Sequence, residues 1–292
     1  MYKRQELYFK GSDGTHGDEL WKTDGTEEGT VMVKNIANTS DTYNSDIYEF
    51  QHFNGYLYFV ADSGNYCNQG GKGRELMRTD GTEEGTVVVI DINDECQNNN
   101  AEDASPHLLA VVGDYLFFGA NDGENGKELW KSDGTAEGTS MVKDIQPGGN
   151  DGFIGTGINN RAVFKGEYYF TGLSSNSVGQ ELWKSDGTEE GTVMVKDIWP
   201  NYQKSSQPSN FVATTDYLYF VANDGVHGRE LWRTDGTEEG TIMLETNDGE
   251  FGGMKYASQG VEFGDYFYFS SCDNCDGGSD DGDLGQELWR TD

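Results

Sequence analysis

The chain of 292 residues carries 52 acidic and 20 basic residues, which gives a formal net charge of −32 at pH 7. A charge of this sign repels nucleic acid and anionic lipid, so neither is an expected partner. No run of residues approaches the roughly 18 apolar positions that a membrane span needs, and no signal peptide opens the chain.

The first five residues differ in character from the rest of the chain. Tyr2-Lys3-Arg4-Gln5 resembles the in-frame translation of a transposase adaptor used in sequencing libraries, and the chain stops inside a repeated motif. We therefore expect that residues 1–5 are not native. We also expect that residues 6–292 form one array, truncated at both ends, that belongs to a longer polypeptide.

One phrase recurs along the whole chain. It reads ELWKTDGTEEGTVMVKNI at 19–36 and returns with small changes at 75–92, 128–145, 181–198 and 230–245, and ELWRTD closes the chain at 287–292. We number these six copies as repeats one to six. A repeat of about fifty residues indicates a supersecondary element that buries its core only by stacking on its neighbours.

Four strand-like runs succeed one another in repeat three, at 107–112, 114–120, 127–132 and 139–145. We name them runs A, B, C and D. Run B is apolar or aromatic nearly throughout, as expected for a strand that is covered on both faces. Asp-Gly pairs come after runs B and C, and they supply the positive φ angles that hairpin turns require.

Four antiparallel strands in each of several repeats predict an all-β fold, a β-propeller of about six four-stranded blades. Seven or eight blades in the full protein is the alternative. The coils of a solenoid are much shorter than these repeats, and an immunoglobulin-like array needs nearly twice the length in each domain.

These repeats resemble the ELWxxDGT repeat proteins, a family of large secreted or surface proteins of bacteria. Glu-Leu-Trp-x-x-Asp-Gly-Thr stands unaltered in repeats one, three, four and five, and Met77 replaces the tryptophan in repeat two. The resemblance covers residues 6–292. It implies a propeller-like module in an extracellular or cell-surface setting, and it implies little about ligand or chemistry.

The repeated phrase itself is predicted to be structural. Its glutamate recurs in every repeat, whereas a catalytic carboxylate needs to occur once with a distinct partner. We expect the glutamate to bridge to a neighbouring blade or to pair with a nearby Lys or Arg. In the turn after run C, Asp133 is expected to cap backbone N–H groups, and Gly138 to adopt a conformation that other residues avoid. No catalytic residue is predicted, and calcium binding by this turn is the alternative.

Four cysteines lie in the segments that vary between repeats. Cys67 lies in the loop between runs B and C of repeat two, and Cys96 lies in the linker that leaves the same repeat, so they are predicted to form a disulfide. Cys272 and Cys275 are predicted to pair locally in the corresponding loop of repeat six. Disulfides suit an oxidising compartment, and unpaired or metal-bound thiols are the alternative.

The loop of repeat six is also the candidate metal site. It reads CDNCDGGSDDGDLG at 272–285, and its candidate ligands are Asp273, Asn274, Asp276, Asp280, Asp281 and Asp283. Six to eight oxygen ligands with Gly at the bends is what Ca²⁺ requires, so Ca²⁺ is the one cofactor that we expect. A solvated acidic loop without a bound ion is the alternative.

Three aromatic residues are the candidate ligand-binding residues: Trp199 and Tyr202 in the linker after repeat four, and Tyr66 in the loop beside Cys67. Aromatic rings at exposed positions stack on sugars or anchor protein partners. Packing over a blade edge is the alternative for Trp199. His16 and His227, which occupy equivalent loop positions, are expected to be exposed turn residues.

These observations predict a noncatalytic extracellular binding or adhesion module. Its variable loops and linkers would contact a polysaccharide or a surface protein, with Ca²⁺ ordering the acidic loop. One alternative is a carbohydrate-active hydrolase or lyase, for which Arg161 and Glu262 are the charged side chains expected in runs A. The other is a rigid spacer in a larger surface protein.

Overall fold

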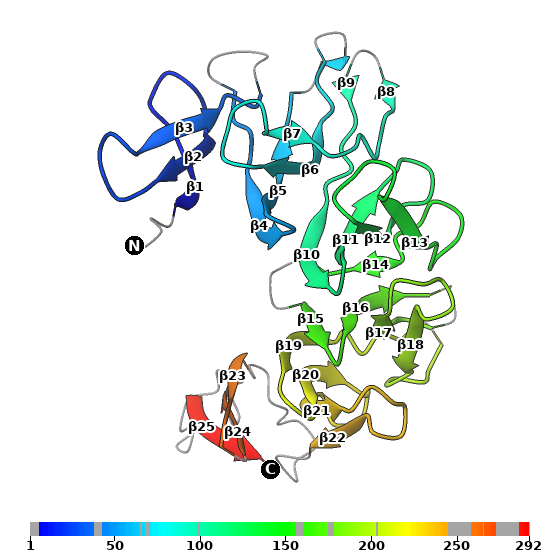
Figure 1. Cartoon of the computed structure of the whole chain (residues 1–292). Helices are drawn as coiled ribbons and strands as arrows, with labels where there is room; N and C mark the ends of the chain where they lie inside the picture. The colour runs from blue at the N-terminus through cyan, green and yellow to red at the C-terminus, as the bar shows by residue number, and fades with distance from the viewer. Residues whose placement is uncertain are drawn as a thin grey trace, which may run out of the picture. The chain divides into compact units, whose positions relative to one another are not determined.

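The computed structural model of the chain is built from β-strands (Figure 1). It describes residues 6–37, 43–64, 66–67, 70–97, 100–155, 160–174, 178–202, 204–244, 258–264, 266–272 and 286–291. Within these ranges no helix is long and apolar enough to cross a membrane. The predicted all-β class, with several antiparallel sheets, is confirmed.

The chain is divided into two compact units, which are described separately. The first contains residues 1–141 and 148–150, and the second contains residues 142–147 and 151–292.

In the described part of the first compact unit, each sheet is an antiparallel meander whose strands are arranged in chain order. The sheet of repeat one consists of β1 (Leu7–Gly11), β2 (Glu19–Thr23) and β3 (Val31–Lys34). The sheet of repeat two consists of β4 (Tyr48–Phe53), β5 (Tyr56–Asp62), β6 (Arg74–Thr79) and β7 (Val87–Val88). The sheet of repeat three consists of β10 (His107–Val112), β11 (Tyr115–Asn121), β12 (Lys127–Ser132) and β13 (Ser140–Lys143), and β8 (Cys96–Gln97) pairs with β9 (Asn100–Ala101) in the linker before it.

The second compact unit repeats this plan. The sheet of repeat four consists of β14 (Phe153–Ile154), β15 (Arg161–Phe164), β16 (Glu167–Leu173), β17 (Gln180–Ser185) and β18 (Val193–Lys196), with β14 and β15 both paired to β16. The sheet of repeat five consists of β19 (Ser209–Ala213), β20 (Leu218–Asn223), β21 (Arg229–Thr234) and β22 (Ile242–Leu244). The described strands of repeat six are β23 (Ser258–Phe263), β24 (Tyr266–Cys272) and β25 (Gln286–Thr291).

The order of strands within repeats two, three and five matches the predicted runs A to D. The main difference in repeat three is in length, because run D was predicted over 139–145 and β13 is shorter. In repeat four, run A is interrupted, and its two pieces pair with different parts of the same neighbour.

A small residue on the second strand makes room for the repeated phrase on the third. Gly172 of β16 lies opposite Glu181 of β17, and a Cβ on this glycine would lie 2.6 Å from the Cδ1 atom of Trp183. Ala120 lies opposite Glu128 in repeat three in the same way. Close packing of this kind tolerates little added volume, which explains why this position of run B is small.

The tryptophan of the phrase fills the space between consecutive sheets. Trp130 is 9% exposed and shares one apolar cluster with Tyr58 and Leu76 of the preceding repeat. Met77, which replaces the tryptophan in repeat two, shares a cluster with Leu20 of repeat one. The slot therefore requires a large apolar side chain, and an indole is one of two solutions found in the chain.

The turn after run C is capped by its own side chains. Asp133 Oδ1 accepts hydrogen bonds from Thr135 N and Thr135 Oγ1 at 2.8 and 2.7 Å, and the hydrogen bonds from Thr135 hold the pKa of Asp133 below its usual value. Thr135 Oγ1 in turn accepts a hydrogen bond from Gly138 N at 3.0 Å. The same contacts occur at Asp24, Asp80, Asp186 and Asp235.

The reason predicted for Gly138 is wrong. The residue with a positive φ in this turn is Gly134, at +97°. Gly138 is required for a different reason, because a Cβ at this position would lie 2.0 Å from Asp133 Oδ1. The carboxylate that caps the turn therefore occupies the space that a side chain would need.

Candidate functional site

The glutamate of the phrase is a buried clamp on the linker that leaves its own repeat. Glu181 Oε2 accepts hydrogen bonds from Ile198 N at 3.0 Å and from Ser206 Oγ at 2.5 Å, and Glu181 Oε1 accepts one from Ser206 N at 3.1 Å. Burial raises the pKa of Glu181 to about 7, although these hydrogen bonds oppose the shift. The carboxyl group thus ties the end of run D to the residues that precede the next run A.

Two more glutamates, in the first compact unit, also accept hydrogen bonds from the linker that follows their repeat. Glu75 accepts hydrogen bonds from Ile92 N and Ala104 N at 3.1 and 3.2 Å, and burial raises its pKa to about 9. Glu19 accepts hydrogen bonds from Ile36 N and Ser45 Oγ. These glutamates have a structural role, as predicted, but their partners lie in the linker that follows the same repeat. The prediction named a neighbouring blade or a basic side chain instead. Burial is the first cause of the raised pKa values.

In repeats one, three and four, a lysine near the end of run D contacts the turn of the following repeat. Lys196 Nζ donates hydrogen bonds to Glu238 O at 3.3 Å and to Thr241 O at 2.8 Å. Lys143 makes the same pair of contacts with repeat four, and Lys34 makes them with repeat two. These ammonium groups donate to carbonyl groups of the turn, and Glu238 O also accepts a hydrogen bond from Thr241 N. The lysine therefore attaches the end of run D to that turn.

We expect Lys196→Met to lower the free energy of unfolding by about 1 to 2 kcal/mol, since the substitution removes both hydrogen bonds and keeps the apolar stem. The measurement is denaturant unfolding followed by tryptophan fluorescence. Lys204→Met is the matched control, because Lys204 is exposed and lies over the Trp199 ring at 5.6 Å. Equal losses in the two variants would contradict a specific role for Lys196.

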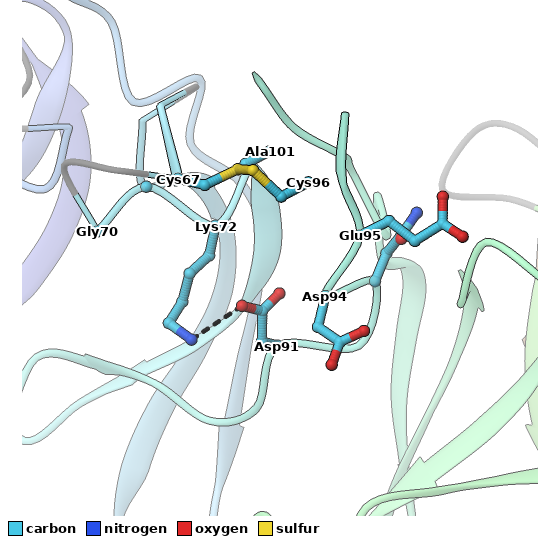
Figure 2. Close-up of a pocket in the computed structure, with 10 residues that line it drawn as sticks. Cys67, Gly70, Lys72, Asp91, Asp94, Glu95, Cys96 and Ala101 are labelled. Atoms are coloured by element: carbon cyan, nitrogen blue, oxygen red, sulfur yellow. Dashed lines mark hydrogen bonds and ion pairs between the residues drawn. A yellow bond between two sulfur atoms is a disulfide. The ribbon is translucent and has the colours of Figure 1, made fainter. Parts of the chain in front are cut away.

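Figure 2 shows a small pocket bounded by the varied segments of repeat two. A disulfide joins Cys67 of the B–C loop to Cys96 of the linker, and their Cα atoms are 6.2 Å apart. Beside it, Lys72 Nζ forms an ion pair with Asp91 Oδ2 at 2.9 Å. The disulfide connects the loop to the linker, and the ion pair connects the loop to the end of the repeated phrase. The loop is therefore held at two points.

The chemistry of this pocket is acidic and its capacity is small. Its volume is about 180 Å³, below the range of about 300 to 1,000 Å³ that is usual for small-molecule sites. Asp94 and Glu95 add negative charge, and Lys72 is already paired with Asp91. The pocket therefore offers little to a polyanion or to a large ligand.

The structure brings Trp199 and Tyr202 into one linker but gives them different environments. Trp199 packs on the next loop so closely that a Cβ on Gly225 would lie 2.1 Å from the indole ring. Tyr202 is 70% exposed. Tyr66 is half-exposed and forms a β-bridge with Asn100. Trp199 thus has the packing role that was the alternative, and Tyr202 is the aromatic ring that faces solvent.

The two loop histidines are turn caps. His227 Nδ1 contacts Asp224 Oδ2 at 2.7 Å, while Asp224 Oδ1 accepts a hydrogen bond from His227 N. In repeat three Asn125 makes both contacts with Asp122. Because an amide replaces the imidazole without loss of geometry, the Asp–His pair is explained by the turn and not by proton transfer.

The predicted calcium ligands, Asp273, Asn274, Asp276, Asp280, Asp281 and Asp283, lie outside the described residues, as does Cys275. Cys272 is the last residue of β24. In the part of the chain that the structure describes, no group of three or more His, Cys, Asp or Glu side chains is arranged to hold a metal ion. Glu262, considered for catalysis on the sequence, accepts hydrogen bonds from Thr215 N and Thr215 Oγ1.

A pocket that the sequence did not predict lies in the second compact unit. It has a volume of about 290 Å³ and is lined by the sheets of repeats four and five, with Arg229 as its basic residue. Arg229 Nη2 donates a hydrogen bond to Ser209 Oγ at 2.6 Å, and Nη1 donates one to Gln207 O at 3.3 Å. The signal in the sequence was an arginine at the start of run C, but its surroundings come from other segments.

Comparisons with known proteins place the fold but not the family. No family model matches the chain, and no curated protein matches it. Among solved structures, prolyl oligopeptidase B from Galerina marginata, bound to a 35mer hydrolysis and macrocyclization substrate, is similar with a TM-score of 0.51 and 9% identity over 98% of this chain. A puromycin hydrolase mutant is similar with a TM-score of 0.48 and 12% identity over 88% of this chain, and Pyrococcus horikoshii acylaminoacyl peptidase with a TM-score of 0.43 and 10% identity over 92%.

The chain spans about two fifths of the length of these proteins, 40% for prolyl oligopeptidase B and 38% for the puromycin hydrolase. The prediction of an adhesion function is wrong by this comparison, because the solved fold that the chain shares is that of part of prolyl oligopeptidase B. The sequence reasoning inferred adhesion from the repeat architecture and the family resemblance, and neither of these determines function.

Proposed function

We propose that this chain is a β-propeller of about six blades within a peptidase-type protein, and that it binds peptides without cleaving them. The proposal is supported mainly by the likeness to prolyl oligopeptidase B, which extends over 98% of this chain and 40% of that one. Such coverage fits one part of a larger enzyme. The proposal assigns bond cleavage to a different part of the full protein.

The internal structure of the repeats supports a role as a rigid frame for peptides. Buried glutamates fix the linkers, and in three repeats a lysine such as Lys196 attaches run D to the turn of the next repeat. A frame of this kind can present varied loops at low conformational cost. The disulfide between Cys67 and Cys96 fits the extracellular setting that is part of the proposal.

Calorimetric titration of the purified chain tests this function. Peptides of 25 and 35 residues are suitable probes, because substrates of these lengths are bound in prolyl oligopeptidase B. We expect saturable binding of peptides, weaker binding of oligosaccharides of similar mass, and intact peptide by mass spectrometry after incubation. Preference for the oligosaccharides would contradict the peptide assignment, and cleavage by the purified chain would contradict its noncatalytic role.

A further inference from the structure

The pocket around Arg229 differs in charge from the rest of the chain. The protein has a net charge of −32. None of the described residues that line this pocket is acidic, and its polar side chains include Asn160, Thr171, Gln180 and Ser209. A cation in neutral surroundings is an unusual feature in so acidic a protein.

Neutral groups hold Arg229 in place. Its guanidinium donates hydrogen bonds to Ser209 Oγ and to the carbonyl oxygen of Gln207. Burial lowers its pKa, as expected for a cation that has lost part of its hydration. A guanidinium carries five N–H donors in a planar fork, and the contacts of Arg229 with the described residues use two of them.

The arginine at the equivalent position of repeat two, Arg74, is paired with carboxylate groups. Arg74 is the first residue of β6, as Arg229 is of β21. Arg74 Nη2 contacts Asp46 Oδ2, and Arg74 Nη1 contacts Asp103 Oδ2, both at 2.7 Å. Two carboxylates thus neutralise Arg74.

Asp46 and Gln207 occupy the same place in their repeats. Each lies two residues before run A, directly after a serine whose carbonyl accepts the N–H at the end of the second strand. Each also has a positive φ, +44° for Asp46 and +49° for Gln207. In repeat five, therefore, a neutral amide stands where repeat two has the carboxylate that pairs with arginine.

We propose that the pocket around Arg229 binds a carboxylate group of a peptide. This inference rests on the proposed peptide-binding function and assigns the ligand group for one site. An arginine fork binds a carboxylate through two parallel N–H···O bonds. The carboxylate of the peptide would supply to Arg229 the negative charge that Asp46 supplies to Arg74. Of the described lining residues, Gln180 and Asn160 are neutral and do not repel such an anion.

The pocket is large enough for only a small part of a peptide. Its volume of about 290 Å³ lies just below the usual range for a small-molecule site, so it accommodates one end or one side chain of a peptide. The group is thus the C-terminal carboxylate or the side chain of an acidic residue. The chemistry at Arg229 is the same for both sources.

Calorimetry with three versions of one unstructured hexapeptide distinguishes these sources. The first has a C-terminal carboxylate and no acidic side chain, the second is its C-terminal amide, and the third is the amide with one internal glutamate. We expect a carboxylate to lower the Kd by about tenfold or more relative to the plain amide, as charge-assisted hydrogen bonds do. Whichever of the first and third binds more tightly identifies the source.

Two variants test the role of Arg229 in different ways. Arg229→Gln should abolish the preference for a carboxylate. Gln207→Asp should abolish it as well, because it recreates the Asp46–Arg74 pair inside the protein and keeps the fold intact. Lys204→Gln removes the same charge as Arg229→Gln from an exposed position and should leave the preference unchanged.

The outcomes separate this inference from the proposed function. Equal Kd values for all three hexapeptides would overturn the carboxylate site and leave peptide binding in place. If no peptide binds, the proposed function fails, and N-acetylglycine then tests the pocket alone. Saturable binding of N-acetylglycine that is lost in Arg229→Gln supports the site, and absence of such binding overturns it.

Discussion

Glu181→Ala lowers the free energy of unfolding by roughly 3 to 5 kcal/mol, the largest effect that we expect from a single side chain. The substitution leaves Ile198 N and Ser206 N without the acceptor that they use in the folded protein, and it leaves Ser206 Oγ with Gln180 O as its acceptor. Each buried donor without a partner costs about 1 to 3 kcal/mol. Denaturant unfolding measures the loss.

Glu190→Ala is the matched control for this substitution, because Glu190 is exposed in the turn of the same repeat. We expect a change within about 0.5 kcal/mol for the control. Similar losses of unfolding free energy in the two variants would contradict a specific role for the hydrogen bonds of Glu181, since they would indicate a general effect of removing negative charge.

The buried glutamates also predict how stability depends on pH. Burial raises the pKa of Glu181 to about 7 and that of Glu75 to about 9, from an ordinary value near 4.5. Above pH 4.5 the unfolded chain releases these protons while the folded chain retains them. The contribution is therefore complete below pH 4.5 and decreases as pH rises towards 7 for Glu181 and 9 for Glu75.

Unfolding curves between pH 5 and 9 measure this dependence. We expect stability to fall across the range and the slope below pH 7 to become smaller in Glu181→Gln, whatever its stability at one pH. An unchanged slope in this variant would show that Glu181 does not retain its proton on folding.

Removing the disulfide between Cys67 and Cys96 should have the second largest effect. The two residues are 29 positions apart, and closing a loop of about this length stabilises a fold by roughly 3 to 4 kcal/mol. We expect Cys96→Ser, or reduction of the protein, to destabilise the first compact unit by this amount. Thermal unfolding with and without a reductant provides the measurement.

The double variant Cys67→Ser with Cys96→Ser controls for effects on other thiols. It should unfold as the single variant does, and the unfolding of its first compact unit should not change when a reductant is added. A response of the same size in the double variant would assign the effect to a different pair of cysteines.

Much of the fold was predictable because its determinants are close together in sequence. The Asp-Gly pairs specify the turn after run C, where Asp133 caps Thr135 two residues later. Alternation along run C predicts that Trp130 and Leu129 face opposite neighbours. These relations depend on fixed spacings, and so they recur in each repeat wherever the same letters recur.

The partners of the buried glutamates were predictable in kind but not in identity. Glu181 reaches Ser206 at a separation of 25 residues, whereas Glu75 reaches Ala104 at a separation of 29. The linkers differ in length and composition, and sequence spacing alone does not show which linker residue donates to the glutamate. The path of each linker in the folded structure determines that residue.

The chain by itself determined the strands, the capped turns and the apolar slot between sheets, because short-range hydrogen bonding and alternation act over a few residues. Tertiary structure decided that Arg74 meets Asp46 and Asp103, while among the described residues Arg229 donates to Ser209 Oγ and Gln207 O. That difference depends on side chains 20 to 29 positions apart, brought together by strand pairing. A charge is neutralised or left available by its neighbours in space, and these neighbours are set by the fold.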